Sequence, residues 1–256
     1  MRDILAPLAA AAPDGGIFVD FDGALAPIVA DPASAKPVKG AADVLQDLAR
    51  VFRVVAVVSG RPVSFLSDRL TVRGVRLVGL YGIEERIGRS LRVLPEAQKA
   101  RGAVEAAARQ LATRLGSNAV IERKGFALSV HFRRSDEPEA RMFEAEPIVK
   151  GVAEDQGLVV SQGKLVWEIA PDTRTDGKGE VVRRLVEQHG LKAALAAGDD
   201  RGDIAALAAV GDLPVSLKVG VSSPEMPSEL RDVADLVVDG PEGLVALLRE
   251  LRRLAR

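Results

Sequence analysis

Short apolar runs alternate with segments of helical periodicity along the first part of the chain. Three short, mainly apolar runs predict buried strands at residues 17–21, 54–58 and 75–80. Residues 41–52 and 63–70 carry apolar side chains at helical spacing, and Pro62 is placed to open the second of these helices. The order strand, helix, strand, helix, strand predicts parallel strands with helices on the faces of the sheet.

The periodicity changes in the middle of the chain, where each of two helical segments precedes a pair of short strands. The predicted elements are a helix at 96–115, strands at 119–123 and 127–132, a helix at 137–156 with Pro147 as the candidate point of interruption, and strands at 158–161 and 165–169. Glycine-containing turns between the paired strands indicate hairpins. The segment therefore predicts a small α+β unit, an antiparallel sheet with two helices, inserted into the α/β chain.

The α/β pattern then resumes. It predicts helices at 178–189, 203–210 and 244–254 and strands at 194–197 and 214–219. Asp3 and Pro7 interrupt the apolar N-terminal residues, so a short helix is predicted there rather than a signal peptide. The predicted fold class is α/β: a Rossmann-like core with a mainly parallel sheet and helices on both faces, carrying the inserted unit.

Composition and charge exclude several functions. Lys+Arg is 35 and Asp+Glu is 36, and this balance argues against a nucleic-acid binder or a polybasic membrane-surface protein. The chain has no cysteine, which excludes disulfides, thiolate metal sites and cysteine nucleophiles. Its two histidines, His131 and His189, are far apart in sequence, so neither a histidine zinc site nor a Ser-His-Asp triad is expected. No apolar run is long enough to span a membrane, and the cytoplasm is the predicted compartment.

Polar side chains follow several of the predicted strands. They are Asp20 and Asp22 after the first strand, Ser59 after the second, Asp199 and Asp200 after a late strand with Asp203 beyond, and Lys178 at a helix start. Parallel α/β sheets place their sites at the carboxyl ends of the strands, so we expect these groups to converge. Clustered carboxylates favour Mg²⁺, and Mg²⁺ beside a lysine and a hydroxyl suits a phosphoryl group. Without cysteine or a usable histidine, the nucleophile would be a carboxylate, and the intermediate an aspartyl-phosphate.

The same residues carry a resemblance to a known family. Asp20-Phe-Asp-Gly-Ala-Leu25, Val58-Ser-Gly-Arg61, Lys178-Gly179 and Gly198-Asp-Asp-Arg-Gly-Asp203 resemble the four motifs of the haloacid dehalogenase (HAD) superfamily. Within it, the chain is similar to trehalose-6-phosphate phosphatases at residues 21–28, 79–84, 121–133 and 167–171. The resemblance covers most of the chain and implies a HAD-like hydrolase core of residues 1–85 and 167–256 with a cap domain of residues 86–166.

The resemblance implies a role for each matched residue of the core. Asp20 would be the nucleophile, and Asp22 the general acid and then the general base. Mg²⁺ would be held by the Asp20 carboxylate, the Asp22 backbone carbonyl and Asp199. Further implied metal contacts are Asp200 and Asp203, and implied phosphate contacts are Ser59, the amides near Gly23 and Gly60, and Lys178.

For the cap, the resemblance implies sugar recognition. The candidate substrate-binding residues are Glu122, Lys124, His131, Arg133 and Glu168, with Arg61 from the core. Alternate positions on a strand share a face, so Glu122 with Lys124, and His131 with Arg133, are predicted to point the same way. The alternatives are an ordinary solvated hairpin face, and for Arg61 a residue that merely starts a helix.

Other functions stay open at this stage. Ala24 stands where the family usually has threonine, and Leu80-Tyr81 where it usually has Ser-His. The expected substrate is trehalose 6-phosphate, with a trehalose-6-phosphate synthase as a candidate partner; the alternative is another glycosyl phosphate, such as sucrose 6-phosphate or mannosyl-3-phosphoglycerate. A phosphoacceptor signalling module would be about half as long and would lack the second aspartate of the pair. A catalytically inactive HAD protein is the third alternative, because Ala24 lacks the hydroxyl.

Overall fold

The computed structural model describes residues 2–29, 31–163, 165–173, 177–223 and 226–255. The chain divides into two compact units, one of Met1–Arg92 with Thr175–Arg256 and one of Val93–Arg174. The predicted cap, residues 86–166, differs from the second unit at both ends.

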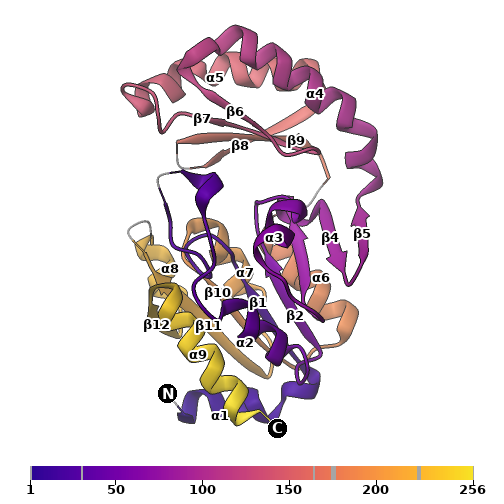
Figure 1. The fold of residues 1–256 in the computed structure, drawn as a ribbon, viewed down its shortest axis with the longest axis vertical. Coiled ribbons are helices and arrows are strands. Elements are labelled where there is room, and N and C mark those ends of the chain that lie inside the picture. Colours follow the sequence, from indigo (N-terminus) through magenta and orange to yellow (C-terminus); the bar gives the residue numbers. More distant parts are fainter. Residues whose placement is uncertain (1, 30, 164, 174–176, 224–225, 256) are drawn as a thin grey trace. The chain divides into compact units, whose positions relative to one another are not determined.

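The first unit is built on an eight-stranded sheet with the order β12-β11-β10-β1-β2-β3-β4-β5 (Figure 1). In chain order its strands are β1 (Gly15–Val19), β2 (Val54–Val58), β3 (Arg76–Gly79), β4 (Glu84–Ile87), β5 (Ser90–Val93), β10 (Ala193–Gly198), β11 (Val215–Ser222) and β12 (Leu236–Asp239). The pairs from β12 to β3 are parallel, and β4 pairs with β3 in the antiparallel sense. The carboxyl ends of β1, β2 and β10 therefore lie side by side at one edge of the sheet.

Helices cover both faces of this sheet. They are α1 (Arg2–Ala10), α2 (Ala41–Leu48), α3 (Val63–Arg69), α6 (Lys178–His189), α7 (Ile204–Ala208), α8 (Ser228–Val233) and α9 (Gly240–Leu254). Ile17 and Val19 of β1 pack into the core that contains side chains of α1, α2, α3 and α9. Phe18, which points to the opposite face, packs with side chains of α6, α7 and α8. Burial on both faces explains why these strands are continuous apolar runs.

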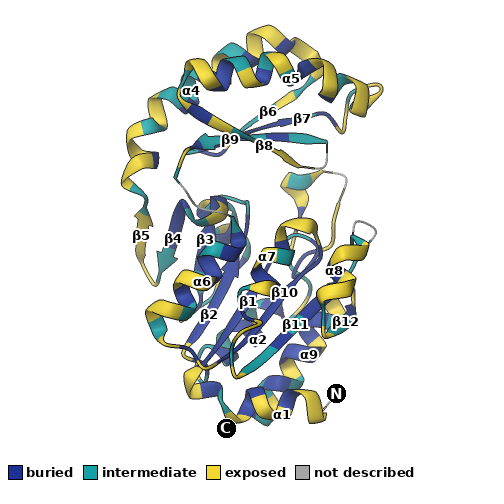
Figure 2. Cartoon of the chain, turned by 180° about the vertical axis from the view of Figure 1, so that it is seen from behind, coloured by how far each residue is buried: buried dark blue, intermediate teal, exposed yellow. Residues whose placement is uncertain are grey.

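The second unit is a four-stranded antiparallel sheet with two helices on one face. The helices are α4 (Pro95–Leu115) and α5 (Pro138–Asp155), and the sheet has the order β6 (Val120–Arg123), β7 (Leu128–His131), β9 (Val166–Pro171) and β8 (Leu158–Gly163). Leu128, Val130, Trp167 and Ile169 form its core with the helices (Figure 2). The register places Glu122 beside Ser129, and Ser129 beside Glu168, on the other face. The predicted fold class, an α/β core with an α+β unit, is confirmed.

Several elements differ from the sequence prediction. Strands β4, β5 and β12 and helix α8 were not predicted. Strand β9 continues to Pro171, so residues assigned to the core by prediction lie in the second sheet. Helix α5 passes through Pro147 without ending, at the cost of one backbone hydrogen bond. The predicted N-terminal helix is present as α1. Among the described residues, no helix is both long and apolar enough to cross a membrane.

Candidate active site

Asp20, Lys178 and Asp203 form a buried group at the carboxyl end of the sheet. Asp20 follows β1 directly, and its backbone N–H donates to the Ala197 carbonyl of β10 at 3.0 Å. Lys178, the first residue of α6, lies 3.0 Å from Asp20 Oδ1 and 2.8 Å from Asp203 Oδ1. At most 5% of each of these three residues is exposed. These three residues are far apart in the sequence, and the prediction that they converge is confirmed.

The loop after β10 is organised by Asp203 rather than by Asp199 or Asp200. Asp203 Oδ2 accepts hydrogen bonds from the backbone N–H groups of Asp199 at 3.0 Å and Asp200 at 3.2 Å. The Asp200 carboxylate caps the short 3-10 helix Arg201–Asp203 by accepting from the Asp203 N–H. Gly198 is required beneath the loop, since a Cβ there would lie 2.0 Å from the Asp203 carboxyl carbon. Asp203 therefore fixes the main chain that carries Asp199.

Asp199 carries a buried oxygen that has no hydrogen-bond partner among the described residues. Asp199 is 1% exposed, and within the described residues its Oδ2 makes no hydrogen bond. One carboxylate oxygen of each of Asp20, Asp199 and Asp203 lies within 4.8 Å of the others. A buried unpaired carboxylate oxygen is costly unless a cation compensates it. Three converging carboxylates form an oxygen-only donor set, which is what Mg²⁺ prefers, so the residues fit this ion.

The remaining predicted metal residues lie differently. The Asp200 carboxylate is 55% exposed and lies 3.8 Å from the Lys178 ammonium. It is not in the close group of three carboxylates formed by the described residues. Both oxygens of the Asp22 carboxylate are bound by Arg61. A metal contact by Asp22 would therefore come from its backbone carbonyl, as the family resemblance implies.

The ionisable groups perturb one another strongly. Burial, followed by the charge of Asp203, raises the pKa of Asp199 to about 7. Burial likewise raises the pKa of Asp203 to about 6 against the opposing effect of Lys178, and raises the pKa of Asp20 well above its ordinary value. Burial lowers the pKa of Lys178, but the nearby carboxylates outweigh it, Asp20 first, and the net pKa is well above the ordinary value. A bound cation would replace the protons that these carboxyl groups otherwise retain.

Ser59 and its neighbours form the side of the candidate site that follows β2. Ser59 is 1% exposed, and its Oγ accepts from the Arg61 N–H at 3.2 Å. The Tyr81 N–H donates to the Ser59 carbonyl at 3.1 Å, and a Cβ on Gly60 would lie 2.6 Å from the Tyr81 ring. Tyr81 has a positive φ of 56°, which is uncommon for a residue other than glycine. Tyr81 also contributes to the electrostatic environment of Lys178, so it belongs to the site although sequence analysis gave it no role.

The predicted phosphate contacts are brought together only in part. Ser59 directly follows β2 and Lys178 is the first residue of α6, as predicted. The Gly23 amide instead donates to the Ala26 carbonyl at 2.7 Å, so it is engaged within its own turn. Gly23 leaves room for Asp199, and a phosphate contact by the amides near it stays a prediction.

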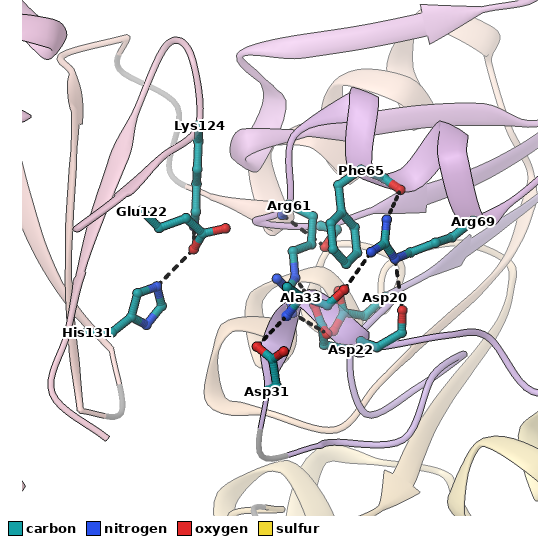
Figure 3. Close-up of polar contacts among 12 residues, drawn as sticks. Asp20, Asp22, Asp31, Ala33, Arg61, Phe65, Arg69, Glu122, Lys124 and His131 are labelled. Atoms are coloured by element: carbon teal, nitrogen blue, oxygen red, sulfur yellow. Dashed lines mark hydrogen bonds and ion pairs between the residues drawn. The ribbon is translucent and has the colours of Figure 1, made fainter. Parts of the chain in front are cut away.

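The second unit holds a separate cluster of polar side chains on the face of its sheet opposite the helices. Lys124 Nζ lies 3.2 Å from both Glu168 oxygens, and Ser129 Oγ donates to Glu168 Oε2 at 2.7 Å. The His131 ring nitrogen lies 2.8 Å from Glu122 Oε2 (Figure 3). The cluster therefore joins four of the predicted substrate-binding residues. Arg133 lies in the turn after β7, and its role in substrate binding stays a prediction.

Two serines that touch these groups were not predicted from the sequence. Ser129 alternates with His131 on β7, and this alternation could have identified it. Ser223 hydrogen-bonds to Asp199 and lowers its pKa. It follows β11 directly, so the strand-end rule would have found it had the predicted strand not ended at Val219.

The comparisons with known proteins agree with the fold. A solved haloacid dehalogenase-like hydrolase from Bacteroides thetaiotaomicron matches 93% of this chain and 99% of its own, with a TM-score of 0.64 and 13% identity. A solved trehalose-6-phosphate phosphatase related protein matches 93% of this chain and 97% of its own, with a TM-score of 0.76 and 22% identity. Together with the carboxylates at the strand ends, these likenesses define a HAD-like fold, an α/β core with an inserted second unit.

Sequence similarity is more specific. The family model for trehalose-phosphatase matches residues 18–234, and the chain belongs to this family. A trehalose-phosphate phosphatase of Mycobacterium marinum is 34% identical over 215 residues, which are 81% of this chain and 54% of the relative. The chain thus spans about half the length of the curated relatives that it matches first. The family predicted from the sequence motifs is confirmed.

Proposed function

We propose that this chain is a Mg²⁺-dependent phosphatase that hydrolyses trehalose 6-phosphate to trehalose and phosphate. The observation that carries the proposal is the buried Asp20 carboxylate, 3.0 Å from the Lys178 ammonium and within 4.8 Å of Asp199 and Asp203 oxygens. Membership of the trehalose-phosphatase family and similarity to a mycobacterial trehalose-phosphate phosphatase support the substrate.

The proposed reaction has two steps. In the first, an Asp20 carboxylate oxygen attacks phosphorus, the bond from phosphorus to the sugar oxygen breaks, and Asp22 donates a proton to that oxygen. In the second, water attacks the phosphorus of the Asp20 acyl phosphate, Asp22 takes its proton, and the Asp20 carboxylate is released with phosphate. A sugar alkoxide is a poor leaving group, so its protonation is worth about 10²–10⁴-fold in rate.

The charges of the site suit this chemistry. Asp20, Asp199 and Asp203, with the Asp22 backbone carbonyl, would hold Mg²⁺, which supplies positive charge to the phosphoryl oxygens. The Lys178 ammonium offsets the negative charge of Asp20 and of the phosphoryl group, so that two anions can approach each other. Ser59 would donate its hydroxyl to a phosphate oxygen. Each of these groups is fixed by backbone or side-chain contacts before substrate binds.

Recognition of the sugar is assigned to the polar cluster of the second unit, Glu122, Lys124, Ser129, His131 and Glu168. Carboxylates accept hydrogen bonds from sugar hydroxyls, while lysine and histidine donate them. Arg133 stays a predicted contact. A trehalose-6-phosphate synthase, which would supply the substrate, stays the predicted partner.

The test is phosphate release from trehalose 6-phosphate, glucose 6-phosphate, sucrose 6-phosphate and p-nitrophenyl phosphate, with and without Mg²⁺. Asp20→Asn is the blank because it keeps the side-chain shape and removes the nucleophilic oxygen anion. We expect trehalose 6-phosphate to be the preferred ester, with no release by the variant or after chelation of the metal. Preference for another sugar ester would retain the phosphatase chemistry and reject the trehalose assignment.

A further inference from the structure

The Asp22 carboxylate is bound by one side chain through both of its oxygens. Arg61 Nε donates to Asp22 Oδ2 at 2.8 Å, and an Arg61 terminal nitrogen donates to Oδ1 at 2.9 Å (Figure 3). Such a fork is the strongest and most directional contact that arginine makes with a carboxylate. In the described part of the chain, Arg61 is the one side chain that forms a hydrogen bond or ion pair with this carboxylate. The Arg61 side chain is 11% exposed, whereas that of Asp22 is 35% exposed.

Arg61 is itself held on the face of its guanidinium. The group stacks 4.4 Å from the centre of the Phe65 ring, and the Arg69 guanidinium lies 3.6 Å from the same ring centre. Arg69 is anchored through hydrogen bonds to the carbonyls of Ala33 at 2.6 Å and Ala35 at 2.9 Å. Cation–π contacts of this kind hold the guanidinium plane in one orientation.

The main chain of Arg61 is fixed as well. Its N–H donates to Ser59 Oγ at 3.2 Å, and its carbonyl accepts from the Leu80 N–H at 3.0 Å. Phe65 makes an edge-to-face contact with Phe21, the residue between the two catalytic aspartates, at a centroid distance of 5.8 Å. The backbone contacts and the contact with the Phe65 ring therefore orient the Arg61 guanidinium independently of its contact with Asp22.

We propose that Arg61 is a positioning residue that acts through Asp22, and not a contact to the sugar or the phosphate. The inference rests on the proposed function. Arg61 holds the half-exposed Asp22 carboxylate at the place where the leaving oxygen needs a proton. In the acid step one Asp22 oxygen carries the proton while the other keeps its hydrogen bond to Arg61. In the base step Asp22 takes a proton from water and the two-oxygen contact is free to form again after that proton is released.

Ala24 makes this arrangement more important in this chain. Ala24 is fully buried in the apolar core of the first unit and has no hydroxyl to offer to the motif. Among the described residues, the side-chain hydrogen bonds that orient the Asp22 carboxylate come from Arg61. This proposal differs from the sequence prediction that Arg61 binds substrate, and the experiment below distinguishes the two.

The experiment compares two esters that differ in their need for a general acid. An alkoxide leaving group requires protonation, whereas p-nitrophenolate leaves as a stable anion. The ratio kcat/KM reports the first step, because release of the alcohol or phenol ends it. Arg61→Met and Arg61→Lys are measured with trehalose 6-phosphate and with p-nitrophenyl phosphate, each in the unmodified chain and in Asp22→Asn. Arg50→Met, a surface arginine paired with the exposed Asp47, is the matched control.

We expect Arg61→Met to lower kcat/KM for trehalose 6-phosphate by about 10–100-fold, part of the general-acid contribution, and to change p-nitrophenyl phosphate by less than about threefold. Arg61→Lys keeps the positive charge but cannot bind both Asp22 oxygens through a guanidinium. Its kcat/KM for trehalose 6-phosphate should lie between the values of the unmodified chain and of Arg61→Met. In the Asp22→Asn variant, replacing Arg61 should not lower kcat/KM any further. Thermal unfolding of each variant separates misfolding from these effects, and Arg61→Lys carries the test if Arg61→Met does not fold.

Equal losses on both esters, or a loss that persists in Asp22→Asn, would show that Arg61 contacts the substrate and would overturn the inference. If the unmodified chain hydrolyses p-nitrophenyl phosphate and a different sugar phosphate, the trehalose assignment fails, and the same comparison is made with that sugar phosphate. If it hydrolyses no ester, the proposed function and this inference both fail.

Discussion

The α-carbon of Gly23 lies directly against the Asp199 carboxylate: a Cβ added to Gly23 would lie 2.0 Å from Asp199 Oδ2. This oxygen is buried and makes no hydrogen bond within the described residues. Gly23 also has a φ of 77°, which disfavours any residue with a Cβ. The turn after β1 and the loop after β10 can therefore approach each other only because position 23 is glycine.

Gly23→Ala is expected to abolish hydrolysis and to lower the stability of the fold. The methyl group would displace Asp199 from the group of three carboxylates, and the left-handed backbone adds about 1 kcal/mol of strain. Phosphate release and thermal unfolding measure the two effects. Gly88→Ala is the matched control, because Gly88 has a φ of 61° and nothing within 4 Å of its Cβ position. Similar losses of activity and stability in Gly23→Ala and Gly88→Ala would show that backbone strain alone causes the effect.

Stability of the metal-free protein is expected to fall as pH rises from about 4 to about 7. The pKa of Asp199 is about 7 and that of Asp203 about 6 in the fold, against an ordinary value of 3.8. The folded state therefore holds more protons than the unfolded state in this interval, and the stability these groups contribute at low pH is lost as pH passes through the folded pKa values. Thermal unfolding in a chelator at pH 5, 6, 7 and 8 measures this dependence.

Mg²⁺ should reverse the trend, because it stabilises the ionised carboxylates that the proton otherwise neutralises. The increase in Tm on adding Mg²⁺ is expected to be larger at pH 8 than at pH 5. Asp199→Asn removes the orphaned oxygen anion and should reduce this increase and weaken the pH dependence. An increase in Tm that is equal at both pH values would contradict the assignment of the ion to these carboxylates.

The sequence predicted most reliably the elements whose ends have a local physical cause. Both ends of β2 agree with the prediction because the strand is apolar and buried on both faces. Both ends of α6 agree because Gly177 precedes it and Gly190, with a left-handed φ of 58°, ends it. Strand β5 has no such signal: its residues are largely exposed, and only pairing with β4 makes it a strand.

The same distinction holds for the site. The strand-end rule located Asp20, Ser59 and Asp199 because it depends only on where apolar runs stop. The partner of Arg61 could not be predicted in this way. It depends on how Phe65 packs against Phe21 and on the anchoring of Arg69, which are contacts between side chains that no spacing in the sequence encodes.

Lys178→Met is expected to abolish activity and to destabilise the protein more at pH 8 than at pH 5. The ammonium is the buried countercharge of both Asp20 and Asp203, at 3.0 Å and 2.8 Å. Removing one partner of a buried ion pair costs about 3–5 kcal/mol, because the other charge stays buried. At pH 5 the carboxyl groups can take up protons instead, which limits the loss. Unfolding by urea at pH 5 and pH 8 measures this difference in stability. Lys192→Met, at an exposed position between α6 and β10, is the control.

Glu168→Gln should impair use of the sugar phosphate and leave a small aryl phosphate unaffected. Glu168 accepts hydrogen bonds from Ser129 and Lys124, so the neutral amide would weaken the contacts that orient both donors. Charged hydrogen bonds contribute about 1.5–3 kcal/mol, so KM for trehalose 6-phosphate is expected to rise by about tenfold or more. The kcat/KM for p-nitrophenyl phosphate should stay within about twofold, because that ester has no sugar for a carboxylate to bind. Glu139→Gln, at an exposed position of α5, is the matched control. An equal loss of kcat/KM with both esters would contradict the assignment of sugar recognition to the polar cluster of the second unit.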